Sequence, residues 1–489
     1  MPVVLSTGQS IERDATVSAL DLAERAARRC LDAGSGLDTL VQLVSVVDVL
    51  SETGPAPGAL LARRLGLAPA RTEVSTIGGN SPQWLVNRAA AAISAGELHG
   101  VLVLGAEAQR SAKVRGGNRV SAVEGGAHAG SGQDLVPDAV VGDDRSGVGA
   151  AELSVGLVAP VHVYALFESV IEQRAGRTPA EHRAVLGELM APFTEVAAAH
   201  RSAWFPEVRT PAALATVTPD NRLVAEPYPK RMCAFLHVDQ GAAVLVTSLA
   251  AARTAGVADR AVYCWSGADA TDVWFPSARP DPGSSPGLRA ALSAATAAAQ
   301  LGVDDIGAFD VYSCFPCAVE MAVEALGITG TDTRGLTVTG GLPYFGGPGN
   351  NYSLHAIATM VERLRERGGT GLVSALGWYA TKHAVGIYGA APPQGGWRRG
   401  DTGEAQRAID ASAVAVATEA QGPAVVVAST VAVAPDGSVS AAPVIARLAD
   451  GRHIAAAAAP TELAGLAGRN LVGELVDVSG RPPRYRVGP

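Results

Sequence analysis

One series of elements occurs twice in this chain, and it constrains the fold more than any other feature. In the first half a strand ends at Leu50, and a helix, the pair Gly78-Gly79, an alanine-rich helix and another strand follow. In the second half a strand ends near Tyr312, and a helix, the glycine-rich stretch 340–349, a helix and a strand follow in the same order. A duplicated α/β unit is the simplest interpretation, and chance similarity between two α/β units is the alternative.

Apolar periodicity and glycines at helix ends predict the individual elements. Helices are expected over residues 17–33, 59–65, 83–95, 179–199, 287–301, 318–326 and 352–367. Continuous runs of Val and Leu, typical of strands covered on both faces, predict buried strands in parallel sheets. These strands cover residues 41–49, 101–105, 242–247, 261–266, 308–312 and 371–376.

The length of 489 residues is too great for one core, so we expect several domains. The first half spans residues 1–260 and includes an inserted helical lobe at about 125–225, which opens with a loop over 125–147. The second half spans residues 261–392. Beyond it, five predicted strands and one short helix indicate a small β-barrel of the OB type over residues 393–489.

Composition narrows the possible partners. The net charge is −8 and basic residues are not clustered, so we expect no nucleic-acid partner. Apolar runs are too short for a membrane span, and the charged residues 12–14 arrive before any apolar leader segment. The five cysteines form an odd, sparse set that suits a reducing compartment better than a disulfide framework. The sequence therefore predicts a cytoplasmic protein.

Several motifs in one order resemble the thiolase superfamily across roughly residues 1–390. Gly78-Gly79-Asn80 leads into an alanine-rich helix, as the nucleophile turn of thiolases does. Residues 237–243 resemble the Asp-Gly-Ala-Ala stretch that opens a core strand, and residues 312–315 (Tyr-Ser-Cys-Phe) resemble the His-Asp-Cys-Phe loop of sterol-carrier-protein-type thiolases. The stretch 340–349 resembles the Gly-His-Pro loop. The resemblance implies a five-layered α/β/α/β/α core, and the extra β domain points to thiolase-like proteins often labelled acetyl-CoA acetyltransferases.

The departures from the thiolase pattern fall on the catalytic residues. The resemblance places Gly79 at the nucleophilic cysteine and Gly347 at the histidine of the Gly-His-Pro loop. The second catalytic cysteine falls at Leu376 or Gly377, so that Cys314 is the one cysteine of the pattern that is present. A thiolase needs a cysteine to carry the acyl group and a histidine to activate it. Condensation or thiolysis through these positions is therefore not expected.

Three other residues could supply chemistry. Cys314 follows a predicted strand and precedes a helix, whose dipole would lower the pKa of a thiol. His355 and His383 come from segments that surround the site in thiolases, and a Cys–His–His group would suit acyl transfer. The alternatives are an inert core thiol and packed histidines. The pattern Cys314-Phe315-Pro316-Cys317 also allows thiol–disulfide exchange, whereas a zinc site would need a second pair.

Two glycine-rich turns form the predicted cofactor-binding site. Gly79 and Asn80 precede one helix, and Gly347, Asn350 and Asn351 precede another. Backbone amides there could bind an anion or a thioester oxygen. The alternative is that the glycines serve close packing and the asparagines cap helices. Coenzyme A is implied by the resemblance alone, because neither Gly-x-Gly-x-x-Gly after the first strand nor a P-loop is present.

Two functional hypotheses follow. The first is a thiolase-like, CoA-dependent acyltransferase that acts on an acyl thioester, with Cys314, His383 and His355 as catalytic residues. The second is a catalytically degenerate thiolase-like protein that binds acyl-CoA or a partner protein. Both predict acyl-CoA or a related thioester as ligand, with no covalently bound cofactor and no metal. The expected oligomeric state is a monomer or a homodimer.

Overall fold

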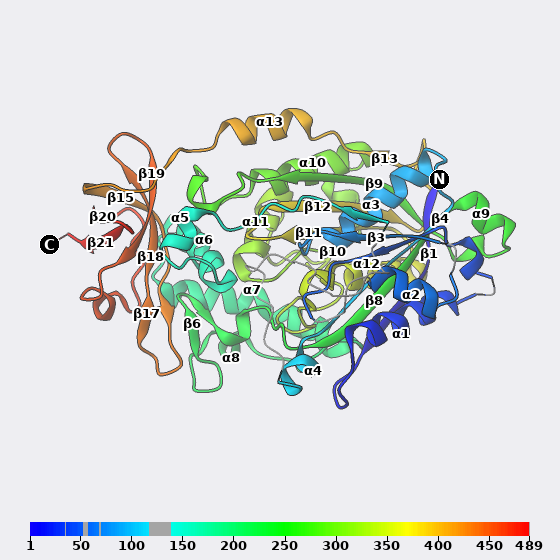
Figure 1. The fold of residues 1–489 in the computed structure, drawn as a ribbon, viewed down its shortest axis with the longest axis horizontal. Coiled ribbons are helices and arrows are strands. Elements are labelled where there is room, and N and C mark those ends of the chain that lie inside the picture. Colours follow the sequence, from blue (N-terminus) through cyan, green and yellow to red (C-terminus); the bar gives the residue numbers. More distant parts are fainter. Residues whose placement is uncertain (35, 52–56, 68–69, 117–137, 489) are drawn as a thin grey trace.

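An eleven-stranded mixed sheet runs through the molecule, and each half of the chain supplies one part of it (Figure 1). The computed structural model describes residues 1–34, 36–51, 57–67, 70–116 and 138–488. The first-half strands are ordered β1 (Pro2–Ile11), β8 (Asp239–Ser248), β4 (Gly100–Ala108), β2 (Leu43–Val46), β3 (Arg71–Ser75) and β5 (Ala139–Val141). The second-half strands are ordered β10 (Ala308–Asp310), β11 (Thr370–Gly377), β12 (Lys382–Gly389) and β9 (Val262–Thr271). Pairing of β1 with β9 joins the two parts, and β13 (Arg398–Arg399) pairs with β9.

Helices complete five layers around these strands. On the outer side of the first-half strands lie α1 (Ala19–Leu31) and α2 (Pro57–Arg64). Between the two parts lie α3 (Ser81–Ser94) and α12 (Tyr352–Arg367), which contact strands of both halves. On the other side of the second-half strands lies α10 (Pro286–Ala299), with α11 (Pro316–Leu326) beside it. The predicted duplicated α/β/α/β/α core is confirmed.

The alanine-rich sequence of α3 explains why this helix can occupy the central layer. Its buried residues include Ala89 and Ala90, which are 4% and 1% exposed. Alanine has high helix propensity and adds little bulk, so strands from both sides can approach the helix axis. Pro82 lies in the first turn, where a missing backbone N–H costs nothing.

The prediction of parallel sheets holds for only part of the sheet. Parallel pairing joins β2 to β3 and β4, β3 to β5, β10 to β11, and β13 to β9. The pairs β1–β8, β1–β9, β4–β8, β9–β12 and β11–β12 are antiparallel. The reason is the connection: only residues 378–381 separate β11 from β12, and so short a link cannot make a parallel crossover. The sequence patterns also missed β1, which lies at the junction of the two parts.

The C-terminal domain lies at the end of the molecule opposite the N-terminus, and the helical lobe lies next to it (Figure 1). The lobe contains α5 (Ala150–Ser154), α6 (Pro160–Arg174), α7 (Pro179–Ala199), α8 (Pro211–Ala215) and the short strands β6 (Leu223–Ala225) and β7 (Tyr228–Pro229). Part of the loop predicted over residues 125–147, namely 125–137, lies outside the described residues. Short helices α4 (Gln109–Val114) and α9 (Leu249–Thr254) flank the first-half strands.

The C-terminal region forms the predicted barrel. The order β19 (His453–Ala458), β18 (Pro443–Leu448), β15 (Gly422–Ser429), β20 (Leu475–Ser479) and β21 (Arg484–Val487) closes through pairing of β21 with β19. The short strand β14 (Val416–Ala417) extends this sheet beside β19, whereas β16 (Ala432–Val433) and β17 (Val439–Ala441) form a separate sheet with β6 and β7 of the lobe. The short predicted helix is a 3-10 turn, Leu463–Leu466.

Hydrogen bonds attach the barrel to helix α6. Ser169 on α6 accepts a hydrogen bond at Oγ from the backbone N–H of Ser429 (3.1 Å) and at its carbonyl from Asn470 Nδ2 (2.7 Å). The helix α13 (Gly403–Ala411) spans the distance between core and barrel (Figure 1). The division at residue 392 stays a prediction.

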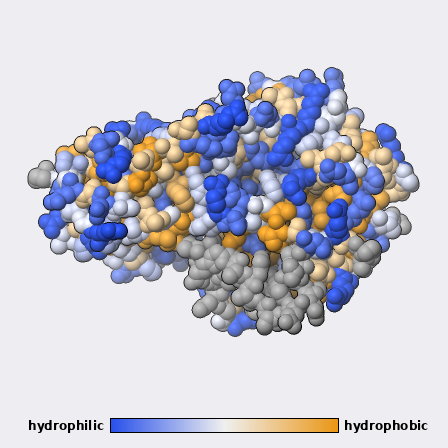
Figure 2. Space-filling model, turned by 45° about the horizontal axis from the view of Figure 1, so that its top comes forward, coloured by the Kyte–Doolittle hydropathy of each residue, from blue (hydrophilic) through white to orange (hydrophobic). Residues whose placement is uncertain are grey.

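The surface on one side of the molecule mixes residue types. Figure 2 shows apolar patches scattered among hydrophilic residues on this face. Across the ranges that the structure describes, no helix combines the length and apolar character that crossing a membrane requires.

Candidate functional site

The two glycine turns, predicted as counterparts in the two halves, contact each other. The backbone N–H of Gly78 donates to Asn350 Oδ1 (3.0 Å), and Ser353 Oγ donates to the carbonyl of Gly79 (2.9 Å). Ser353 lies in the first turn of α12, so the N-terminal ends of α3 and α12 meet here. Residues more than 270 positions apart thus form one place in the fold.

Gly79 has no room for a side chain. A Cβ atom added there would lie 2.5 Å from the carbonyl oxygen of Leu376 and even closer to the hydroxyl of Tyr312, whereas real Cβ atoms keep at least 3.0 Å. At Gly347 the nearest atom would be Leu236 Cδ2 at 3.3 Å, which belongs to a flexible side chain. The hydroxyl of Tyr312 therefore occupies the space that a side chain at position 79 would need, and position 79 is closed to a cysteine.

The asparagines of the second turn use their amide groups to hold the backbone. Asn350 Nδ2 donates to the carbonyl of Asp48 (3.0 Å), and Asn351 Nδ2 donates to the carbonyl of Gly105 (2.7 Å). Both asparagines are buried. These bonds account for the asparagines as structural groups, and ligand binding by Gly347, Asn350 and Asn351 stays a prediction.

Cys314 lies in an aromatic layer rather than in an open turn. It is 7% exposed and belongs to the core beside Phe315, whose ring stacks on Tyr164 with centroids 4.7 Å apart. Burial raises the pKa of the Cys314 thiol to about 12, although a hydrogen bond with Tyr164 acts in the opposite direction. The helix start that favours a thiolate is present at Pro316, but loss of hydration outweighs it.

Cys317 is buried more deeply still. It is 0% exposed, and its Sγ donates to the carbonyl of Tyr164 (3.4 Å). Burial raises the pKa of this thiol well above its usual range. Both cysteines are free thiols. Thiol–disulfide exchange needs an accessible thiolate, so this environment does not favour the redox interpretation.

His355 faces the protein interior from α12. It is 0% exposed, its Nδ1 lies 2.8 Å from Gln9 Oε1, and its ring packs 5.1 Å from that of Phe345. Because Gln9 Oε1 can only accept, Nδ1 carries the proton. Burial lowers the pKa of His355 to about 3, so the imidazole is neutral at physiological pH.

His383 is held by an acidic and a hydroxyl group on the same ring nitrogen. Its Nε2 lies 2.8 Å from Asp272 Oδ2 and 3.1 Å from Ser285 Oγ. A catalytic relay would need these two groups on opposite nitrogens, so the three do not form a serine-protease-like triad. Its Nδ1 is without a hydrogen-bond partner in the described part of the chain.

A cleft of about 990 Å³ opens beside the first glycine turn. The first turn of α3, the start of β12 and the segment after β5 line it. Of the predicted site residues, Asn80 and His383 line the cleft, whereas Cys314 and His355 do not. Asn80 is 7% exposed, and its Oδ1 has no hydrogen-bond partner among the described residues. The structure therefore does not bring the predicted Cys–His–His group together around this cleft.

Lys382 is the basic group nearest the first glycine turn. It is 5% exposed, and its Nζ donates to the carbonyls of Ile77 (2.6 Å) and Asp143 (3.2 Å). A Cβ atom at Gly78 would lie 3.1 Å from this nitrogen. Burial lowers the pKa of Lys382 to about 8, and the charge of Arg145 acts in the same direction.

Two arginines of the cleft stand against aromatic rings. The guanidinium of Arg145 lies 3.6 Å from the ring centre of Trp274, and that of Arg88 lies 5.2 Å from the ring centre of Trp84. All four residues line the cleft. The cleft thus offers cations and flat apolar surfaces together. Five aspartates also line it, namely Asp143, Asp144, Asp269, Asp272 and Asp410. Arginine and tryptophan side chains together suit the anionic and planar groups of a ligand.

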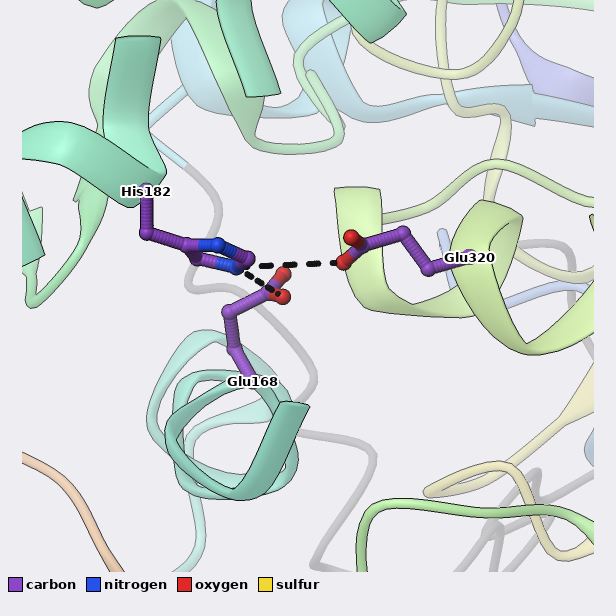
Figure 3. A group of neighbouring side chains, drawn as sticks. All are labelled: Glu168, His182 and Glu320. Carbon is purple, nitrogen blue, oxygen red and sulfur yellow. Dashed lines mark hydrogen bonds and ion pairs between the residues drawn. The ribbon is translucent and has the colours of Figure 1, made fainter. Parts of the chain in front are cut away.

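A separate buried cluster lies between three helices of the lobe and core (Figure 3). Glu168 comes from α6, His182 from α7 and Glu320 from α11, and their ligand atoms lie within 4.8 Å of one another. His182 Nε2 is 2.7 Å from Glu168 Oε1. Burial raises the pKa of Glu168, and burial with the neighbouring Glu168 charge raises that of Glu320 well above its usual range.

The proton on His182 decides what this cluster can do. Arg177 Nη1 lies 3.3 Å from His182 Nδ1, and a guanidinium can only donate. His182 Nε2 therefore carries the proton and donates a hydrogen bond to Glu168. The carboxylate of Glu168 also accepts a hydrogen bond from the hydroxyl of Tyr228 (2.6 Å). A metal would need the lone pair of His182 Nε2. In this arrangement the hydrogen bond from His182 to Glu168 joins α7 to α6.

Sequence reasoning missed Lys382, Arg145 and the two tryptophans as cleft residues. One signal was available: lysine is rare in this chain, and Lys382 opens a strand that is otherwise apolar. Arg145 and Trp274 carried no motif, because they meet only through folding.

No protein-family model and no curated protein matches the chain. Among solved structures, a monomeric SCP2-thiolase-like protein type 1 from Mycobacterium smegmatis is 31% identical, with a TM-score of 0.85 over 100% of this chain and 99% of its own. The Ltp2–ChsH2(DUF35) aldolase is 20% identical, with a TM-score of 0.61 over 80% of this chain and 97% of that chain. Acetyl-CoA acetyltransferase from Syntrophomonas wolfei is 17% identical, with a TM-score of 0.57 over 80% and 99%. The last two likenesses show a common fold alone.

Proposed function

The chain belongs to the SCP2-thiolase-like proteins, and we propose that it binds an acyl-CoA or a related acyl thioester in the cleft beside α3 without forming an acyl-cysteine. The observation that carries this proposal is the pairing of a closed nucleophile position with an open cleft. Gly79 has no room for a side chain, yet the cleft next to it keeps a volume of about 990 Å³.

The basic residues and tryptophans of the cleft, which lie among five aspartates, support an anionic, partly planar ligand. Arg88 and Lys382 supply positive charge, and Trp84 and Trp274 supply flat surfaces. The first turn of α3 adds the positive end of a helix dipole at Asn80. Coenzyme A carries phosphates and a purine ring, and its thioester oxygen is a hydrogen-bond acceptor, so these groups match the kinds of contact the cleft offers.

Calorimetry with a panel of acyl-CoAs, from acetyl to long chains, tests the proposal. We expect saturable binding by the wild-type protein and weaker binding by Arg88→Ala, which lines the cleft. Arg289→Ala is the matched control, because Arg289 also lies on a helix, is about as exposed and pairs with an exposed glutamate away from the cleft. Absence of saturable binding across the panel would refute the proposal.

A second candidate function is acyl transfer through Cys314, and its place directly before the N-terminus of α11 favours it. In that case acyl-CoA leaves a thioester-linked adduct on Cys314, which intact mass detects and neutral hydroxylamine removes. The adduct is absent from Cys314→Ala. Turnover that survives Cys314→Ala intact would eliminate this candidate. His383 and His355 as supporting groups belong to the same candidate.

A further inference from the structure

Lys382 differs from the other lysines of the chain in being buried. The sequence contains three lysines, Lys113, Lys230 and Lys382. Lys113 and Lys230 are exposed, whereas Lys382 is 5% exposed at the start of β12. A buried lysine needs a reason, because removing an ammonium group from water is costly unless an opposite charge compensates it.

The partners of Lys382 compensate its charge only in part. Nζ donates to two backbone carbonyls, those of Ile77 and Asp143. The carboxylates whose charges act on Lys382 are those of Asp143, Asp144 and Asp48, and Asp143 is also bound by Arg145 in an ion pair of 2.6 Å. A neutral amine has two N–H groups and one lone pair. The two carbonyls therefore satisfy a neutral amine and leave its lone pair available.

The amine lies at the turn that precedes α3. A Cβ atom added at Gly78 would lie 3.1 Å from Nζ, and Lys382 lines the cleft. Asn80 lines the same cleft, and its buried Oδ1 lacks a partner in the described ranges, so the turn contains an unsatisfied polar group beside the amine. These two observations are independent of each other.

We propose that Lys382 is an acylation site of this protein, and that its amine attacks the carbonyl carbon of the acyl thioester bound in the cleft. This inference rests on the proposed function for the thioester ligand. The lone pair of Nζ forms the new C–N bond, the C–S bond breaks with its electrons on sulfur, and the proton released from nitrogen goes to the thiolate. The products are an amide on Lys382 and a free thiol, and no oxidant, metal or second substrate is consumed.

Burial supports the reactivity of this amine. It lowers the pKa of Lys382 to about 8, so close to half of the amine is neutral at pH 8. An exposed lysine with a pKa near its usual value is neutral in about 0.3% of molecules at that pH. Lys113 and Lys230 are therefore internal controls in every experiment.

The test uses the full chain and acetyl-CoA, with peptide mapping after treatment with neutral hydroxylamine, which removes thioester-linked groups and leaves amides. We expect acetylation of Lys382 at least about tenfold faster than of Lys113 and Lys230. The rate saturates with acetyl-CoA concentration and levels off above pH 8. Lys382→Arg keeps the positive charge and loses the fast modification.

A second reagent separates failure of this inference from failure of the proposed function. p-Nitrophenyl acetate acylates amines and needs no recognition of coenzyme A. Selective acylation of Lys382 by this ester, without binding of any acyl-CoA in calorimetry, would support the reactive amine and refute the proposed ligand. Equal labelling of all three lysines by the ester would overturn the inference, as would unselective acetylation in the presence of measurable acyl-CoA binding.

Discussion

Cys314 and Lys382 are both buried, and burial has opposite consequences for them. Cys314 lies in an aromatic layer, where loss of hydration raises the pKa of its thiol to about 12. Lys382 lies at the wall of a cleft, where loss of hydration lowers the pKa of its amine to about 8. In each case burial disfavours the charged form.

The two groups differ in the charge of their reactive form. A thiol attacks as the charged thiolate, so burial suppresses it. An amine attacks in its neutral form, so burial promotes it. The same physical effect therefore disfavours the reactive form of the Cys314 thiol and favours the reactive form of the Lys382 amine.

The largest expected effect is in the reactivity of Cys314. With a pKa near 12, the thiolate fraction at pH 8 is about 1000-fold smaller than for a thiol with its usual pKa of 9.0. We expect labelling of Cys314 by iodoacetamide in the folded protein to be slower by about that factor than in urea, measured by peptide mapping over time. Labelling at similar rates in both states would remove the contrast between the two sites.

The next effect concerns the closed position next to the cleft. Gly79→Ala places a Cβ against the carbonyl of Leu376 and the hydroxyl of Tyr312, so we expect the free energy of unfolding to fall by about 3 kcal/mol. Gly347→Ala, the matched change in the second half, should cost less than about 1 kcal/mol, because a side chain can yield there. Urea unfolding measures both variants. Equal losses would mean that the two turns are equally tight.

The cost of keeping Lys382 buried can be measured through pH. We expect Lys382→Met to raise the free energy of unfolding by about 1–2 kcal/mol at pH 7. Removal of the poorly compensated charge stabilises the folded state, and the loss of two hydrogen bonds offsets part of this gain. The folded pKa lies below the unfolded value, so the folded state binds fewer protons between about pH 8 and 10.5, and wild-type stability rises relative to the variant across this range. Urea titrations at several pH values check this. A constant difference would show that Lys382 has a normal pKa.

The smallest effect is expected at Glu320, in the acidic cluster beside the aromatic layer. Its raised pKa makes Glu320 bind a proton more strongly in the folded state, so it destabilises the protein as pH rises above 4.5. Glu320→Gln should flatten this decline and change stability at pH 5 by less than about 0.5 kcal/mol. Glu168→Gln is the contrast, since Glu168 accepts from both His182 and Tyr228, and we expect a loss of about 1–3 kcal/mol. Thermal unfolding from pH 5 to 8 compares them, and an unchanged slope in Glu320→Gln would contradict the raised pKa of Glu320.

Much of the core could be predicted from periodicity alone. The predicted helix over 352–367 coincides with α12, and that over 179–199 coincides with α7, because both have clear apolar spacing and end signals. Strand β1 could not be predicted in this way. It pairs with β8 and β9, which follow more than 230 residues later, and no local pattern reports such partners.

In the candidate site, too, local features were predicted from the sequence and contacts between distant segments were not. The turns at Gly79 and Asn350 were found in the sequence, because glycine and asparagine before a helix leave a local signal. The environment of Cys314 was not predicted, since Tyr164, whose side chain hydrogen-bonds Cys314 and whose ring stacks on Phe315, comes from α6, far away in the chain. The arginine–tryptophan pairs of the cleft are likewise contacts between distant segments.

The sequence by itself determined the order of the elements, the duplicated plan and the resemblance to thiolases, because these depend on spacing along one chain. The tertiary structure alone decided that Tyr312 leaves no room for a side chain at position 79, that Cys314 is buried in an aromatic layer and that Lys382 lines the cleft. The physical reason is hydration. The reactivity of an ionisable group depends on which surfaces remove water from it, and those surfaces come from segments that only folding brings together.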